Sequence, residues 1–198
     1  METIEMMFDI ILPSIGRISL PQAIESVIHQ DHKDWRLWIM CDGIRGLNTA
    51  IHDERIVVIE SNEPQHEDFG SWARNTGISL SSNPWIAYID DDDVWLPNHL
   101  STISSLLEAS PHATMIRTAG RSFYWRRKSP RSKEFVRKIS VVNESDILTV
   151  GMAHTRELFK LTKGWQPCDN HDKILWNEMK KAGGQAIETN LLTFEFAR

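Results

Sequence analysis

The chain has 198 residues, of which 41% are hydrophobic and 25% are charged, and its formal net charge is −5. This length supports one well-packed core and is short for two, so we expect a single domain over residues 1–198. Three features predict a cytoplasmic protein: no apolar run is long enough to cross a bilayer, the first residues are acidic rather than basic, and Cys41 and Cys168 give no disulfide framework.

The first 110 residues alternate short apolar runs with helical patterns. We expect strands at 8–12, 35–41, 55–59 and 85–89. We expect helices that start near Ser19 and that cover 69–80 and 97–109. This alternation predicts an α/β fold in which helices cover a mostly parallel central sheet.

The pattern changes in the second half of the chain. We expect a fifth strand at 113–118, then weak strands or loops, and later two helices at 156–163 and 171–182 that each end before a glycine. No internal repeat or linker interrupts this order, which agrees with a single domain.

A basic stretch occupies residues 117–138. It holds nine Lys and Arg residues and the single acid Glu134, so it carries +8 and leaves −13 for the rest of the chain. Phe123, Tyr124 and Trp125 lie within it. Such a stretch suits a lipid-linked glycan, a nucleic acid or an anionic lipid surface, and a solvated surface loop is the alternative.

Four consecutive acids, Asp90 to Asp93, follow the strand expected at 85–89. Ligands of open α/β sheets bind at the carboxyl ends of the strands, and clustered carboxylates repel one another unless a cation lies between them. Hard oxygen ligands suit Mg²⁺ or Mn²⁺ that also binds substrate phosphates, which predicts a nucleotide-diphosphate site. A solvated turn that caps the next helix is the alternative, and four acids fit it poorly.

Four segments, in order, resemble family 2 glycosyltransferases of the GT-A fold, and the resemblance runs from Phe8 to about Gly184. They are Ile10–Arg17 (the nucleotide loop after the first strand), Ala73–Gly77 (Ala-Arg-Asn-x-Gly), Asp90–Leu100 (the aspartate-rich motif with x-Trp-x-Pro-x-His-Leu) and Gly164–Trp176 (the segment with the base). The resemblance implies one GT-A domain, with a nucleotide-sugar-binding half at 1–110 and an acceptor and catalytic-base half at 111–198.

The resemblance also implies roles for the acids. Asp90 and Asp92 would bind Mn²⁺ or Mg²⁺, which neutralises charge on the departing diphosphate. Asp91 would reach the ribose hydroxyls, and Asp93 would hold the loop or cap the helix. Spacing leaves open which acids coordinate the metal directly.

Other predicted donor contacts come from the first strand and from the helix before the acids. Arg74 would bind the nucleotide or diphosphate in a bidentate manner, and an ion pair with a nearby acid is its alternative. Pro13, Ser14 and Arg17 would border the base, while helix capping and solvation remain alternatives for Ser14 and Arg17.

The chain departs from the family pattern after the second strand, where Asp-Asp-Gly-Ser is replaced by Cys41-Asp42-Gly43-Ile44. Either Asp42 takes over recognition of the base, with uridine as the first expectation, or the donor is held differently. A lone cysteine that ends a strand is more often a small buried residue than a nucleophile.

For the catalytic base, the resemblance points to Asp172, and a helix cap is the alternative role. His171 stands where the family commonly has glutamate, and it either assists Asp172 or is structural. His154 is a candidate late metal ligand, with packing or acceptor contact as its alternatives.

The predicted function is metal-dependent, inverting transfer of a single sugar from a nucleotide-sugar donor, with a UDP-sugar expected first, to a hydroxyl acceptor. A nucleotidyltransferase is a weaker alternative, because residues 13–18 lack a glycine-rich phosphate loop. A binding module without turnover is the third hypothesis, suggested by Cys41 and His171. The expected location is cytoplasmic, with peripheral attachment to a membrane surface as an option.

Overall fold

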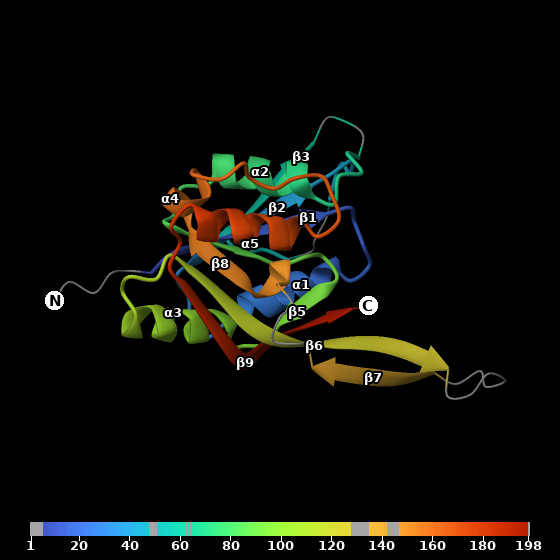
Figure 1. Cartoon of the computed structure of the whole chain (residues 1–198). Helices are drawn as coiled ribbons and strands as arrows, with labels where there is room; N and C mark the ends of the chain where they lie inside the picture. The colour runs from blue at the N-terminus through green and yellow to red at the C-terminus, as the bar shows by residue number, and fades with distance from the viewer. Residues whose placement is uncertain are drawn as a thin grey trace.

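A single large sheet with helices on both faces organises the molecule in the computed structural model, which describes residues 6–47, 51–61, 63, 65–127, 135–141 and 147–197 (Figure 1). Its strands are β1 (Phe8–Ser14), β2 (Trp35–Cys41), β3 (Ile56–Glu60), β4 (Trp85–Tyr88), β5 (Asp93–Trp95), β6 (Met115–Arg127), β7 (Phe135–Val141), β8 (Met152–Thr155) and β9 (Ala186–Ala197). The helices are α1 (Leu20–Ile28), α2 (Ser71–Leu80), α3 (His99–Ala109), α4 (Arg156–Phe159) and α5 (His171–Lys181), and η1 (Thr149–Gly151) is a 3₁₀ turn.

The sheet has the strand order β3-β2-β1-β4-β8-β6-β9-β5, and β7 pairs with β6 outside this path. Strands β3, β2, β1 and β4 run parallel to one another. Their carboxyl ends therefore meet at one edge, as the strand–helix alternation predicts. This half of the sheet confirms the expected parallel, helix-covered architecture.

The other half of the sheet mixes directions. Strand β8 is antiparallel to β4 and β6, β9 is parallel to β6, and β5 is antiparallel to β9. The sequence prediction omitted β5, β8 and β9, because two of them are only three or four residues long and β9 pairs with a segment some 70 residues away. Strand β6 runs past the expected end at residue 118 and continues with β7 as a ribbon that projects from the body (Figure 1).

Apolar side chains fill both faces of the sheet. On β1, Phe8, Ile10 and Leu12 point to one face and Ile11 to the other, as the two-residue period of a strand requires. The first face packs against α1 and α3, and the second against α2 and α5. Within the described residues, no helix combines the length and the apolar character that a membrane crossing needs.

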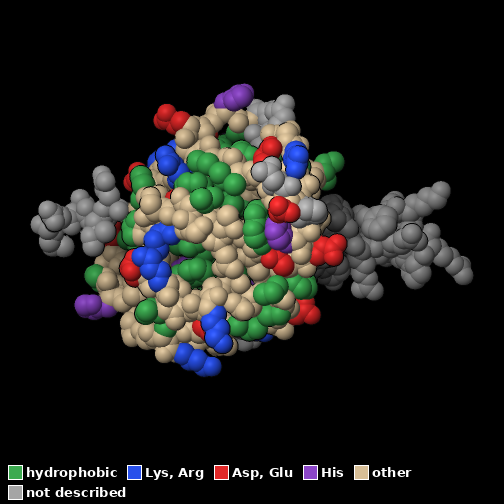
Figure 2. All heavy atoms as spheres, turned by 90° about the horizontal axis from the view of Figure 1, so that it is seen from above, with side chains coloured by type: hydrophobic (Ala, Val, Ile, Leu, Met, Phe, Trp, Pro, Cys, Tyr) green, Lys and Arg blue, Asp and Glu red, His purple; other side chains and the backbone are tan. Residues whose placement is uncertain are grey.

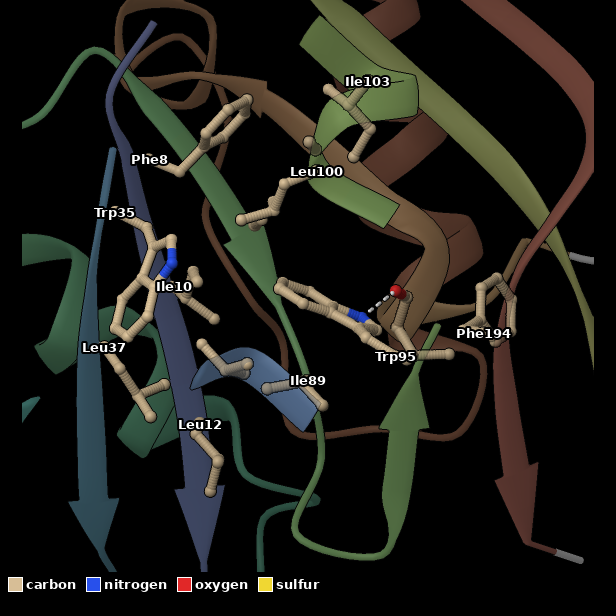
Figure 3. Close-up of a cluster of buried hydrophobic side chains, with 14 of the residues drawn as sticks. Phe8, Ile10, Leu12, Trp35, Leu37, Ile89, Trp95, Leu100, Ile103 and Phe194 are labelled. Atoms are coloured by element: carbon tan, nitrogen blue, oxygen red, sulfur yellow. Dashed lines mark hydrogen bonds between the residues drawn. The ribbon is translucent and has the colours of Figure 1, made fainter. Parts of the chain in front are cut away.

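Trp95 joins the end of the acid-bearing turn to the core. Its indole is 2% exposed, and its Nε1 donates a hydrogen bond to the Val150 carbonyl at 3.0 Å (Figure 3). Trp35 is equally buried, but its Nε1 has no partner among the described residues. The buried indole N–H of Trp95 therefore has a hydrogen-bond partner, and that of Trp35 has none among the described residues.

We predict that Trp95→Phe destabilises the protein by about 1 kcal/mol more than Trp35→Phe, because only the former removes a buried hydrogen bond and leaves a carbonyl unpaired. Urea unfolding monitored by circular dichroism measures both free energies of unfolding. Equal losses in the two variants would contradict this interpretation of the Trp95 contact.

Candidate functional site

A cleft of about 340 Å³ lies at the carboxyl edge of the parallel strands. It brings together the predicted nucleotide-sugar and metal residues Pro13, Ser14, Arg17, Asp42, Arg74, Asp90, Asp91 and Asp92, but not the candidate metal ligand His154. His171 also lines it, whereas Asp172 does not. Viewed from above, acidic side chains gather around a histidine on one side of the molecule (Figure 2).

Asp91 ties the acid turn to the loop after β1. Its carboxylate is buried and accepts hydrogen bonds from the Ser14 hydroxyl at 2.8 Å, from the Ile15 backbone N–H at 3.2 Å and from Arg17. A ribose hydroxyl at this carboxylate would share it with these donors. Ser14 and Arg17 are therefore held by Asp91 while they border the cleft.

Arg74 holds the first acid of the turn. Its guanidinium is 3% exposed, donates to Asp90 and to the Phe69 carbonyl, and lies 4.8 Å from the ring centroid of Trp165. The ion pair that the sequence allowed is thus present, and the side chain still lines the cleft. Its neighbour Asn75 exchanges two hydrogen bonds of 2.9 Å with the Trp165 backbone, which fixes the loop before α5.

Negative charge is in excess at this turn. Burial, followed by repulsion from Asp90 and Asp91, raises the pKa of Asp92, and Arg17 partly offsets the rise. The pKa of the buried Asp93 is raised well above its usual range, first by burial and then by Asp90 and Asp92. The two arginines therefore do not neutralise the cluster.

Asp90 and Asp92 are the acids that fit a metal. Their side chains are 32% and 38% exposed and face the cleft, whereas Asp91 is 1% exposed. Among the described residues, no group of three or more His, Cys, Asp or Glu side chains is arranged to hold a metal ion. A cation here would take two carboxylates and complete its shell with water and substrate oxygens, as Mg²⁺ commonly does.

At the end of β2, Cys41 and Asp42 have separate environments. Cys41 is fully buried, and burial raises the pKa of its thiol to about 11, which confirms the prediction of a small core residue. Asp42 lines the cleft and accepts hydrogen bonds from His66. The sequence analysis missed His66, Gln65 and Phe69; their one signal is that their loop follows the carboxyl end of a parallel strand.

His171 and His154, the two histidines that the sequence analysis considered, have different environments. His171 lines the cleft, and its Nδ1 lies 3.2 Å from the Cys168 carbonyl; burial, followed by Arg74, lowers its pKa. His154 is fully buried, bonded to the Tyr88 hydroxyl at 2.6 Å and stacked on Phe159, and burial lowers its pKa to about 4. Packing, rather than metal binding, accounts for His154.

Only part of the basic stretch is visible. Arg117 pairs with Glu188 at 3.0 Å, and Arg121 pairs with Glu195 at 3.3 Å, so these two cations stabilise the fold. The side chains of Phe123, Tyr124 and Trp125 and of the other basic residues lie outside the described part of the chain.

Residues 9–165 match the family model described as glycosyl transferase family 2. The chain belongs to this family. Over 105 residues it is 36% identical to WcaA of Escherichia coli K12, whose name assigns it to colanic acid biosynthesis as a glycosyl transferase; the match covers 48% of this chain and 36% of WcaA. The chain thus spans little more than a third of that relative.

Solved structures share the fold at low sequence identity. The S. aureus TarS 1–349 structure in complex with UDP superposes with a TM-score of 0.71 at 13% identity, over 98% of this chain and 61% of TarS. The mannosyltransferase PcManGT of Pyrobaculum calidifontis, in complex with GDP-Man and Mn²⁺, gives 0.70 at 13% identity, over 96% of this chain and 56% of PcManGT. The predicted GT-A fold is confirmed.

We predict that Asp93→Asn stabilises the metal-free protein at neutral pH. Folding raises the pKa of Asp93, so the folded state binds this proton more tightly than the unfolded chain, and stability falls as the pH rises through the raised pKa. Asparagine carries no such charge. Thermal unfolding in EDTA should show a higher Tm for the variant at pH 7, and the difference should shrink as the pH falls through the raised pKa and disappear near the unfolded value of about pH 4.

The exposed Asp31 provides the control. Asp31→Asn should leave the pH profile of the Tm unchanged. A neutral-pH Tm of Asp93→Asn at or below that of the wild type would show that the ionised carboxylate stabilises the turn.

Proposed function

We propose that the chain transfers a single sugar from a nucleotide-sugar donor to a hydroxyl acceptor, with inversion at the anomeric carbon. The observation that carries the proposal is the pair of half-exposed carboxylates, Asp90 and Asp92, in a cleft at the carboxyl edge of parallel strands. Their cluster retains excess negative charge, which suits a divalent cation together with a diphosphate.

Asp90 and Asp92 would hold Mn²⁺ or Mg²⁺, and such an ion supplies positive charge to the departing diphosphate. Arg74 keeps Asp90 oriented, and Arg17 lies 3.7 Å from an Asp92 oxygen. Both guanidiniums line the cleft and are near enough to the acids to contact donor phosphates. The Mn²⁺ in the PcManGT complex supports the same choice of ion.

The donor nucleotide would extend from the acids across Pro13 and Ser14 to Asp42, because these residues line one continuous cleft. A UDP-sugar is the first candidate. The TarS complexes with UDP and UDP-GlcNAc support it, and the GDP-Man complex of PcManGT keeps a guanine nucleotide as the second.

Asp172 would act as the general base. In the displacement, its carboxylate takes the proton of the acceptor hydroxyl while the hydroxyl oxygen bonds to the anomeric carbon and the bond from that carbon to the diphosphate breaks. Its place in the first turn of α5, next to the cleft-lining His171, supports this role. The bound acceptor would itself cover the cleft and so keep water away from the reacting sugar.

The acceptor would meet the basic stretch at 117–138. Its surplus of six positive charges, beyond the ion-paired Arg117 and Arg121 and the acid Glu134, is suited to a lipid-linked glycan or to a nucleic acid. A lipid-linked acceptor would bring the protein to the cytoplasmic surface of a membrane.

A binding module without turnover is the second candidate. Cys41 and His171 stand where family members commonly have acids, and Asp172 does not line the cleft. Slow release of nucleoside diphosphate from a nucleotide sugar, abolished by EDTA, would identify the transferase. Binding without release would identify the module.

We predict that Asp92→Asn lowers the affinity for UDP in the presence of Mn²⁺ by about 100-fold or more, because it removes a charged ligand of the metal. Isothermal titration calorimetry with and without Mn²⁺ measures this effect. Glu108→Gln, which neutralises an exposed acid of α3, is the control and should bind as the wild type does. Metal-dependent affinity that survives in Asp92→Asn would remove Asp92 from the site.

We predict that Asp172→Asn binds the donor normally and loses about 10²- to 10⁴-fold in kcat, because an amide cannot accept the hydroxyl proton. Donor turnover and donor Kd measured on the same preparation separate the two effects. Asp169→Asn changes an exposed acid just before α5 and should retain turnover. Wild-type rates in Asp172→Asn would assign the base elsewhere.

A further inference from the structure

Apolar side chains are exposed around the mouth of the cleft. Of the nine large apolar side chains that are exposed among the described residues, four belong to segments that line the cleft. We call these four the apolar rim: Ile15 and Ile18 in the loop after β1, Phe69 in the loop before α2, and Ile174 in the first turn of α5. Single exposed apolar residues are normal on a protein surface, whereas a group of them beside a cleft indicates an interaction surface.

Packing within the fold does not account for two of these side chains. Ile18 is fully exposed, so its side chain buries no apolar area against the protein. Phe69 is 56% exposed although its φ is +58°, a left-handed conformation that bulky residues rarely adopt. Its carbonyl accepts a hydrogen bond of 2.7 Å from Arg74, which holds the loop in this conformation while the ring stays in solvent. Strain that burial does not repay is typical of functional loops.

The apolar rim follows the edge of the cleft. Ile15 and Phe69 line the cleft themselves, and the Phe69 ring centroid is 6.2 Å from that of the cleft-lining His171. Ile174 comes one turn after His171, and side chains of a helix lean toward its N-terminus, so Ile174 leans toward the cleft. Figure 2 shows apolar side chains beside the histidine around which the acids gather. A partner bound to the rim would therefore adjoin the acids.

The charge near the apolar rim favours a lipid partner. Figure 1 shows the loop after β1 and the β6–β7 ribbon on the same side of the body, and the basic stretch at 117–138 falls within the sequence from β6 to β7. An anionic membrane offers phosphates to the six unpaired positive charges of that stretch and an apolar interior to the rim. A nucleic acid would match the charges alone. A second copy of the chain would bring two basic stretches and two acidic clefts together.

We propose that the apolar rim inserts into an anionic membrane surface, so that the cleft receives acceptors that are anchored in the lipid. The inference rests on the proposed function, because only a transferase requires a lipid-anchored hydroxyl at its acids. Insertion of Ile18 and Phe69 below the headgroups places the mouth of the cleft at headgroup level, where the polar part of such an acceptor lies.

Flotation with vesicles of phosphatidylcholine and phosphatidylglycerol tests the proposal. In about 0.5 M NaCl, attraction between charges is screened and the contribution of the rim remains. Ile18→Ser should lower the partition coefficient about tenfold, because insertion removes the isoleucine side chain from water. Ile18→Trp should retain or raise it, because tryptophan favours the membrane interface. Both variants should bind UDP with Mn²⁺ as the wild type does, since Ile18 does not line the cleft.

Leu161→Ser is the matched control, because Leu161 is 69% exposed after α4 and does not line the cleft. It should leave the partition coefficient unchanged. A wild type that does not bind vesicles, or equal losses in Ile18→Ser and Leu161→Ser, would overturn the proposal, while Mn²⁺-dependent binding of UDP in the same preparation upholds the proposed function. Vesicle binding without any binding of UDP or GDP would uphold the membrane contact and overturn the proposed function.

Two further measurements address the other partners. Sedimentation equilibrium without lipid should show the same oligomeric state for the wild type and Ile18→Ser. A dimer that Ile18→Ser dissociates would assign the apolar rim to a second copy and overturn the proposal. Binding of single-stranded RNA that Ile18→Ser weakens would assign it to a nucleic acid, with the same consequence.

Discussion

The arrangement of the site depends on the repulsion among Asp90, Asp91, Asp92 and Asp93 and on how it is only partly relieved. Arg74 from α2 and one arginine from the loop after β1 reach the first two acids, and the pKa values of the last two are raised by burial and by their neighbours. The folded protein therefore maintains an uncompensated negative charge at the mouth of a cleft. That charge favours a cation and, with it, a phosphate-bearing ligand.

The same contacts connect distant segments of the chain. Arg74 and Asn75 are adjacent on α2; the first binds Asp90, and the second binds the Trp165 backbone in the loop that leads to α5. The donor side of the cleft and the segment with the proposed base are thus fixed to one short helix. In this chain the Arg-Asn pair therefore has a structural role, whether or not Arg74 also contacts a donor.

The parallel and the antiparallel strands of the sheet make different contributions to the cleft. Parallel strands β1 to β4 carry the cleft in which we propose that a nucleotide binds, with Asp42 and its partner His66 at one end and the acids at the other. The antiparallel strands support α5 and carry the projecting β6–β7 ribbon (Figure 1). The chain spans only part of the length of the relatives that it matches.

Local patterns in the sequence were sufficient for the first four strands, for the helices around them and for the chemical types in the cleft, because apolar periodicity and short motifs are local properties. Only the tertiary structure revealed the features that form between segments far apart in the sequence. These are strands β5, β8 and β9 and the contact of His66 with the Asp42 carboxylate after β2. Folding also decided which acids are exposed at the cleft. Asp91 turns inward to its donors while Asp92 stays half-exposed, and His171 rather than Asp172 lines the cleft, because one step along a turn or helix changes the direction of a side chain.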